Sequence, residues 1–210
     1  MNTNKLFTPA KVGSTEIKNR IVMAPMTRCR AIANEPNDLM ASYYKQRSGA
    51  GLIITEGTSP SPNGLGYARI PGIFSPEQIA GWKKVTSAVH QGEAKIFVQL
   101  MHTGRISHPL NMPATSEIVA PSAVKAAGQM WTDAAMMQDF PVPKAMSPEN
   151  LVSTLHEFVS AAKNAMEAGF DGVELHAANG YLLEQFLSPV SNIRTDNYGE
   201  IGRASCRERV

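Results

Sequence analysis

The stretch "SPEQIAGWKKVTSAVHQGEAKIFVQLMH", residues 75 to 102, predicts a helix followed directly by a buried strand. Ser75 can cap the helix, Pro76 suits its first position, and Gln78 completes an S-x-x-Q capping box. The next apolar positions share one helical face, and a glycine can end the helix: Ile79, Trp82, Val85, Val89 and Gly92. The run 94–102 is apolar and rich in β-branched residues, which is typical of a strand buried on both faces.

The same alternation of strand and helix extends along the chain. Short apolar runs closed by turn or polar residues predict further buried strands over residues 19–25, 50–57 and 170–177. Helical spacing of apolar residues predicts helices within 36–51 and 147–169, the second carrying the stripe Leu151, Leu155, Phe158, Val159, Ala162 and Met166. This alternation predicts parallel strands covered by helices, either in an open doubly wound sheet or in part of a barrel.

Two long segments rich in glycine and proline, 57–72 and 102–146, follow the carboxyl ends of predicted strands. Loops at that end are where βα folds build their sites. No strand is followed by G-x-G-x-x-G or by G-x-x-x-x-G-K-[ST], so dinucleotide and P-loop sites lose their main support.

Composition excludes several classes of function. The 210 residues carry a formal charge of +2 with both signs interleaved, so neither nucleic acid nor an anionic membrane surface is an expected partner. Cys29 and Cys206 lie far apart, and His102 and His108 have no carboxylate at ligand spacing, so we expect neither a disulfide framework nor a metal site. Without a signal peptide or a long apolar run, the chain is expected to be cytoplasmic.

The stretch "HAANGYLLEQFL", residues 176 to 187, holds the strongest candidates for chemistry. His176 and Asn179 can converge only if the chain turns directly after the strand, and "ANG" can supply that turn. Two neutral donors could then stabilise charge on one carbonyl oxygen, and the Tyr181 phenol could donate a proton. Alternatively, His176 hydrogen-bonds to backbone, Asn179 caps the next helix and Tyr181 packs in its first turn. Spacing alone leaves both interpretations open.

Five segments in order resemble the Old Yellow Enzyme family of FMN-dependent oxidoreductases from about Lys5 to Gly199: "LFTPAKVGSTEIKNRIVMAPMTR", "DLMASYYKQRSGAGLIITEGT", "GYARIPGIFSPEQIAGWKKVTSAVH", "IFVQLMHTGR" and "ELHAANGYLLEQFLSPVSNIRTDNYG". The resemblance implies a TIM (β/α)8 barrel, an α/β fold, truncated here to about the first four strand-helix units. It also implies that an N-terminal β-hairpin, "FTPAKVGSTEIK", closes the bottom of the barrel.

The resemblance further implies roles at matched positions. In the family, His176 and Asn179 correspond to the pair that binds the ligand's oxygen, Tyr181 to the proton donor and Tyr67 to an aromatic residue lining the site. The implied flavin contacts are Pro25, Met26, Thr27, Gly57 and Gln99. The implied activity uses NADH or NADPH to reduce FMN, which then reduces an activated alkene or a related small-molecule electron acceptor. The full-length enzyme would be a monomer or a homo-oligomer.

The resemblance stops at the C-terminal end of the chain. We expect residues 1–199 to be the N-terminal half of an FMN-binding barrel and residues 200–210, "EIGRASCRERV", to be a tail foreign to the family. The barrel's usual phosphate-binding loops follow its seventh and eighth strands, so we expect this fragment alone to bind FMN weakly or not at all, to be inactive and to aggregate. Two alternatives stay open: a βα-barrel lyase or aldolase without flavin, and a non-catalytic half-barrel that self-associates.

Overall fold

The computed structural model describes residues 3–199, and its chain divides into two compact units. The first unit comprises Met1–Thr58, Arg69–Leu100 and Val159–Leu175, and the second comprises Ser59–Ala68, Met101–Phe158 and His176–Val210. The expected foreign tail, residues 200–210, lies outside the described residues.

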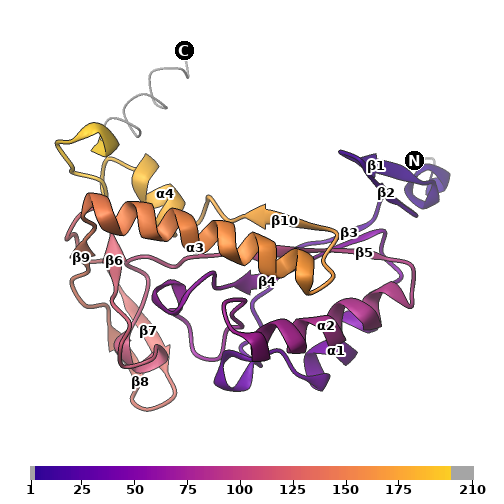
Figure 1. Ribbon diagram of the computed structural model, residues 1–210, viewed down its shortest axis with the longest axis horizontal. Coiled ribbons are helices and arrows are strands. Elements are labelled where there is room, and N and C mark those ends of the chain that lie inside the picture. Colours follow the sequence, from indigo (N-terminus) through magenta and orange to yellow (C-terminus); the bar gives the residue numbers. More distant parts are fainter. Residues whose placement is uncertain (1–2, 200–210) are drawn as a thin grey trace. The chain divides into compact units, whose positions relative to one another are not determined.

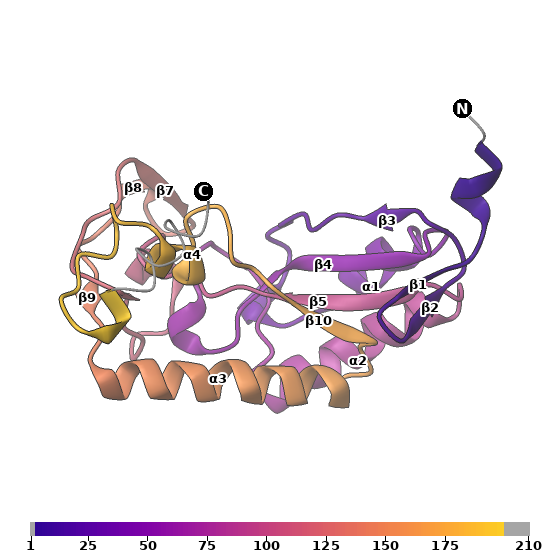
Figure 2. The ribbon, with the colours of Figure 1, turned by 90° about the horizontal axis from the view of Figure 1, so that it is seen from above.

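A parallel four-stranded sheet forms the centre of the first unit. Figure 2 shows its strands side by side in the order β10 (Gly172–Leu175), β5 (Lys95–Leu100), β4 (Leu52–Thr58) and β3 (Val22–Met23). Every neighbouring pair runs parallel. The four predicted strands and their parallel arrangement are therefore confirmed, although β3 has two residues where a run of seven was predicted.

Helices α1 (Asp38–Lys45) and α2 (Pro76–His90) belong to the same unit and lie against each other (Figure 1). The predicted capping box begins α2: Ser75 Oγ accepts from the Gln78 backbone N–H at 3.2 Å, and Gln78 Oε1 accepts from the Ser75 N–H at 3.2 Å. The indole of Trp82 is completely buried, and its N–H donates to Gly72 O at 3.0 Å. The apolar face of α2 is thus the buried one, as its spacing predicts.

Helix α3 (Pro148–Glu167) contributes residues to both units. Its predicted cap is confirmed, because Ser147 Oγ accepts from the Asn150 N–H at 3.2 Å, and the chain leaves the helix at Gly169 with φ +85°. The predicted apolar stripe is only partly buried. Alanines of the helix face the interior, whereas Leu155, Val159 and Met166 remain exposed.

The predicted N-terminal hairpin is present in the first unit as antiparallel strands β1 (Ala10–Val12) and β2 (Thr15–Ile17). Directly after it, Lys18 Nζ donates to the carbonyl oxygens of Ser48 and Gly92, which precede β4 and β5. This part of the chain therefore lies at the amino ends of the strands.

The second unit contains structure where the sequence predicts only a loop. Residues 102–146 include two short strand pairs, parallel β6 (Val119–Ala120) with β9 (Lys144–Ala145) and antiparallel β7 (Gln129–Thr132) with β8 (Met136–Asp139). Strands of two to four residues are too short for alternation to be recognised. Helix α4 (Leu182–Leu187) completes the unit. Short 3-10 helices in the two units span Thr3–Phe7, Ile32–Asn34, Pro62–Gly64, Pro109–Asn111 and Asn197–Gly199.

Candidate active site

The turn after β10 brings two of the predicted catalytic side chains together. The strand ends at Leu175, and Asn179 and Gly180 adopt the left-handed conformation with φ of +58° and +77°. Tyr181 then precedes α4 with extended backbone. As a result, the rings of His176 and Tyr181 meet edge to face with centroids 4.8 Å apart. The predicted departure from extended geometry after His176 is confirmed.

Tyr67 joins this pair from a distant part of the sequence within the same unit. Its hydroxyl lies 2.9 Å from that of Tyr181, at hydrogen-bond distance, and the two rings are edge to face with centroids 6.2 Å apart. Tyr67 itself packs, as Ile106 does, against a small buried apolar cluster: Ala126, Met130 and Phe140. A phenol held by packing at its ring and by a hydrogen bond at its hydroxyl can orient the phenol next to it.

Asn179 occupies the exposed tip of the turn. The alternative in which it caps the following helix is wrong, because the N-cap position of α4 is Tyr181 and no side chain makes a capping hydrogen bond there. The Asn179 side chain is thus available for other partners. Its backbone is left-handed, a conformation that asparagine adopts more readily than most residues.

The predicted flavin contacts lie in the first unit, at the carboxyl ends of its strands. Gly57 of β4 pairs in register with Gln99 of β5, which pairs in turn with Glu174 of β10. A shift of register between Ile54 and Gly57 interrupts the regular pairing of β4 with β5. The buried Gln99 carboxamide donates to Glu174 Oε1 at 2.7 Å, so its orientation is fixed by the neighbouring strand.

The other three predicted contacts, Pro25, Met26 and Thr27, follow β3. Pro25 is half-buried, whereas Met26 and Thr27 are exposed. Their loop is anchored at its far end, where the backbone N–H of Arg28 donates to Glu56 Oε2 at 3.2 Å. The segment after β3 is therefore held at Arg28, and the side chains of Met26 and Thr27 are accessible.

Glu56 is a buried carboxyl group that the sequence interpretation missed. It is 1% exposed, and Tyr44 Oη lies 3.2 Å from its Oε1. Burial raises the pKa of the Glu56 carboxyl group and also that of the Tyr44 hydroxyl. The only signal in the sequence is a carboxylate inside the apolar run "LIITEG". Glu56 precedes Gly57 in β4, and its carboxyl group contacts both the Tyr44 hydroxyl and the Arg28 N–H.

His102 is a second buried ionisable group, at the start of the loop after β5. It is 2% exposed, and its Nδ1 accepts from the Gly104 N–H at 3.1 Å. Burial lowers the pKa of His102 to about 3, so the imidazole is neutral near pH 7 and its proton resides on Nε2. The backbone carbonyl of His102 accepts from the Leu182 N–H at 2.9 Å, which ties this loop to the first residue of α4.

Within residues 3–199, no group of three or more histidine, cysteine, aspartate or glutamate side chains is placed to hold a metal ion. Among the helices described there, none has the length and apolar character needed to span a bilayer.

Known proteins resemble the chain along almost its entire length. The family model described as "NADH:flavin oxidoreductase / NADH oxidase family" matches residues 5–210. A probable flavin mononucleotide-dependent alkene reductase of Leishmania infantum is 44% identical over 207 residues, which are 96% of this chain and 57% of that protein. A 12-oxophytodienoate reductase 7 of Oryza sativa subsp. japonica is 40% identical over 208 residues, covering 96% of this chain and 52% of the relative.

Solved structures give the same result. Morphinone reductase superposes with a TM-score of 0.89 at 42% identity, over 97% of this chain and 56% of that one. The Old Yellow Enzyme homologue from Zymomonas mobilis superposes with a TM-score of 0.90 at 40% identity, over 97% of this chain and 57% of that one. The chain thus spans little more than half the length of the relatives that it matches. By the family model and by these identities, it belongs to the NADH:flavin oxidoreductase / NADH oxidase family, to which the Old Yellow Enzymes also belong.

Proposed function

We propose that this chain is part of an FMN-dependent ene-reductase, which uses NADH or NADPH to reduce the activated double bond of a small molecule such as an α,β-unsaturated carbonyl compound. Family membership and the names of the relatives support the flavin chemistry. The single observation that carries the site assignment is the cluster formed by His176, Tyr181 and Tyr67, in which one phenol lies against an imidazole and within hydrogen-bond distance of a second phenol.

The residues proposed to hold FMN fit a flat, mainly apolar ring with polar edges. Gly57, next to the last residue of β4, has no side chain, and its partner Gln99 in β5 has a buried carboxamide. Thr27 and the backbone after β3 supply further polar groups, while Met26 supplies an apolar one. Ligand sites of this class combine apolar walls with a small number of polar groups held in place. When bound, FMN accepts hydride from the nicotinamide and delivers hydride to the alkene.

His176 and Asn179 are proposed to donate hydrogen bonds to the carbonyl oxygen of the acceptor. Negative charge develops on that oxygen as hydride adds to the β-carbon, so donors placed in advance stabilise the transition state more than the bound substrate. Tyr181 then protonates the α-carbon. Tyr67 keeps the Tyr181 hydroxyl in one orientation through the 2.9 Å contact.

The test is a stopped-flow experiment on the full-length protein that contains this sequence. Mixing the oxidised protein with NADH or NADPH should bleach the flavin spectrum, and adding cyclohexenone should restore it. The double substitution His176→Ala with Asn179→Ala should weaken binding of a phenol that mimics the enolate by about a hundredfold, since it removes two hydrogen bonds to a charged oxygen. A colourless full-length protein would exclude this function and would favour a lyase or aldolase without flavin.

We also propose that residues 1–199 form the N-terminal half of a TIM barrel and that the isolated half binds FMN weakly. The exposed apolar side chains Leu155, Val159 and Met166 on α3 support a larger assembly, because a soluble domain does not usually leave such a stripe uncovered. Flavin titration of the isolated 210-residue chain tests this proposal. Tight binding of FMN by a monodisperse product would contradict it, and a discrete dimer without flavin would favour the self-associating half-barrel.

A further inference from the structure

The side-chain amide of Gln185, in α4, bonds to three backbone groups and is 1% exposed. Its Nε2 donates to Gly180 O at 2.7 Å and to Thr103 O at 3.0 Å, and its Oε1 accepts from the Arg105 N–H at 3.2 Å. Gly180 belongs to the turn that carries Asn179 and Tyr181, whereas Thr103 and Arg105 belong to the loop after β5. One buried amide therefore joins the two loops.

Neighbouring hydrogen bonds also join α4 to the turn that precedes it. The Gln185 N–H donates to Tyr181 O at 2.8 Å, and the Gly180 N–H donates to Glu184 Oε2 at 2.5 Å. The loop after β5 also leaves room for the Gln185 amide, because residue 104 is a glycine. Gly104 has φ +62°, and a Cβ there would lie 2.2 Å from Gln185 Oε1, so a larger residue at 104 would displace the side chain. The bond to Thr103 O is buried, so water could not readily replace the amide there.

We propose that Gln185 is a positioning residue for the active site: through Gly180 O it fixes the turn that presents Asn179 and the Tyr181 hydroxyl. The catalytic part of this inference rests on the proposed function, whereas its structural part does not. Because Gln185 contacts neither the Tyr181 ring nor its hydroxyl in these hydrogen bonds, it acts only through the backbone of the turn.

A matched control lies in the same unit. Asn192 is also buried, at 7% exposure, and its amide donates to Phe186 O at 2.8 Å and to Tyr198 O at 2.9 Å. Its Oδ1 accepts from the Arg194 N–H at 3.3 Å. It thus has the same number and kind of backbone bonds as Gln185, but none of them reaches residues 176–181.

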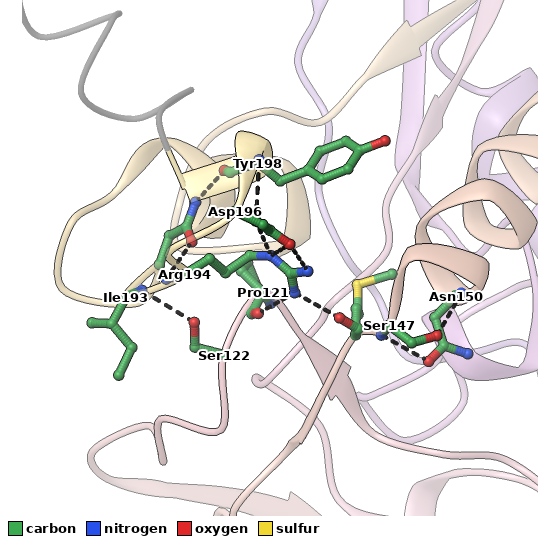
Figure 3. A network of polar contacts seen from close by, with 10 residues as sticks. Pro121, Ser122, Ser147, Asn150, Ile193, Arg194, Asp196 and Tyr198 are labelled. Atoms are coloured by element: carbon green, nitrogen blue, oxygen red, sulfur yellow. Dashed lines mark hydrogen bonds and ion pairs between the residues drawn. The ribbon is translucent and has the colours of Figure 1, made fainter.

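Asn192 bonds to Tyr198 and Arg194. Figure 3 shows the polar network around Arg194 to which these two residues belong. There the guanidinium donates to Pro121 O at 2.9 Å and to Met146 O at 2.6 Å, and it forms an ion pair with Asp196. This network holds the segment after α4 against the ends of β6 and β9. Damage to it should therefore affect stability without moving the Tyr181 turn.

The experiment compares Gln185→Leu with Asn192→Leu in the full-length protein. Hydrogen exchange of a peptide covering residues 176–182 should become about tenfold faster in Gln185→Leu and should not change in Asn192→Leu, because only the first change frees Gly180 O. In the same pair, kcat for cyclohexenone should fall about tenfold in Gln185→Leu only, as expected for a proton donor that is less well placed. Unchanged exchange in Gln185→Leu would overturn the proposal, and so would equal changes in both variants.

A second substitution, Gln185→Glu, keeps the inference testable if the leucine variant does not fold. An ionised carboxylate cannot donate to Gly180 O, whereas a protonated one can. Its kcat relative to the parent should therefore rise as the pH falls, and a ratio that is constant with pH would contradict a positioning role. Faster exchange of the turn with normal kcat would refute the catalytic part. Faster exchange in a protein without flavin would instead refute the proposed function and leave the structural part standing.

Discussion

The buried imidazole of His102 should make the protein less stable in mild acid, by an amount that can be worked out from its pKa. Burial lowers this pKa from 6.5 to about 3. Between these values the unfolded chain binds a proton that the folded chain does not bind. The stability due to the neutral imidazole is therefore complete above pH 6.5 and is lost as the pH falls toward 3. One unit below the unfolded pKa, at about pH 5.5, the loss should be about 1.4 kcal/mol.

The assay is urea unfolding of the parent and of His102→Gln at about pH 7.5 and about pH 5.5. Glutamine can accept from the Gly104 N–H but does not titrate, so the variant should lose about 1.4 kcal/mol less than the parent over this interval. Asn192→Leu provides a destabilised control that keeps His102 and should lose as much as the parent. If the parent and His102→Gln lose stability in parallel, the imidazole is not held neutral by burial and the reasoning fails.

Three further substitutions test other parts of the structure. Under the proposed function, Tyr181→Phe in the full-length protein should slow reoxidation of the reduced flavin by cyclohexenone about a hundredfold or more, because the proposed general acid is removed. Reduction by NADH or NADPH should change little in the same stopped-flow traces. Tyr67→Phe removes one hydrogen bond to the Tyr181 hydroxyl and should slow reoxidation only about fivefold; a loss as large as that of Tyr181→Phe would assign the proton to Tyr67. Ser75→Ala deletes half of the capping box of α2 and should lower the free energy of unfolding by about 1 kcal/mol, and an unchanged urea midpoint would deny the cap that role.

The regular part of the fold could be predicted because its signals are local. The capping box at Ser75 and Gln78 and the buried face around Trp82 depend on spacings within one helix. The four parallel strands could be predicted from apolar runs, which are also local signals. The pairs β6–β9 and β7–β8 were not visible, because strands of two to four residues have almost no period of their own. Parallel β6 and β9 are also separated by more than twenty residues, which include β7 and β8, so no local pattern predicts their pairing.

The site shows the same division between local and distant information. The glycine of "ANG" predicts the turn that brings His176 and Tyr181 together, so this part of the site could be predicted from neighbouring residues alone. The contact of Tyr181 with Tyr67 joins residues 114 apart in sequence, and only the folded structure reveals it. Gln185 lies between these cases. A carboxamide inside the short helix "LLEQFL" should be costly to bury unless every polar atom of its amide group finds a partner. Such a residue therefore signals from the sequence that backbone groups are being held nearby, even though it does not say which ones. In the structure these backbone groups belong to Gly180, Thr103 and Arg105. Gly180 directly precedes Tyr181, the proposed proton donor.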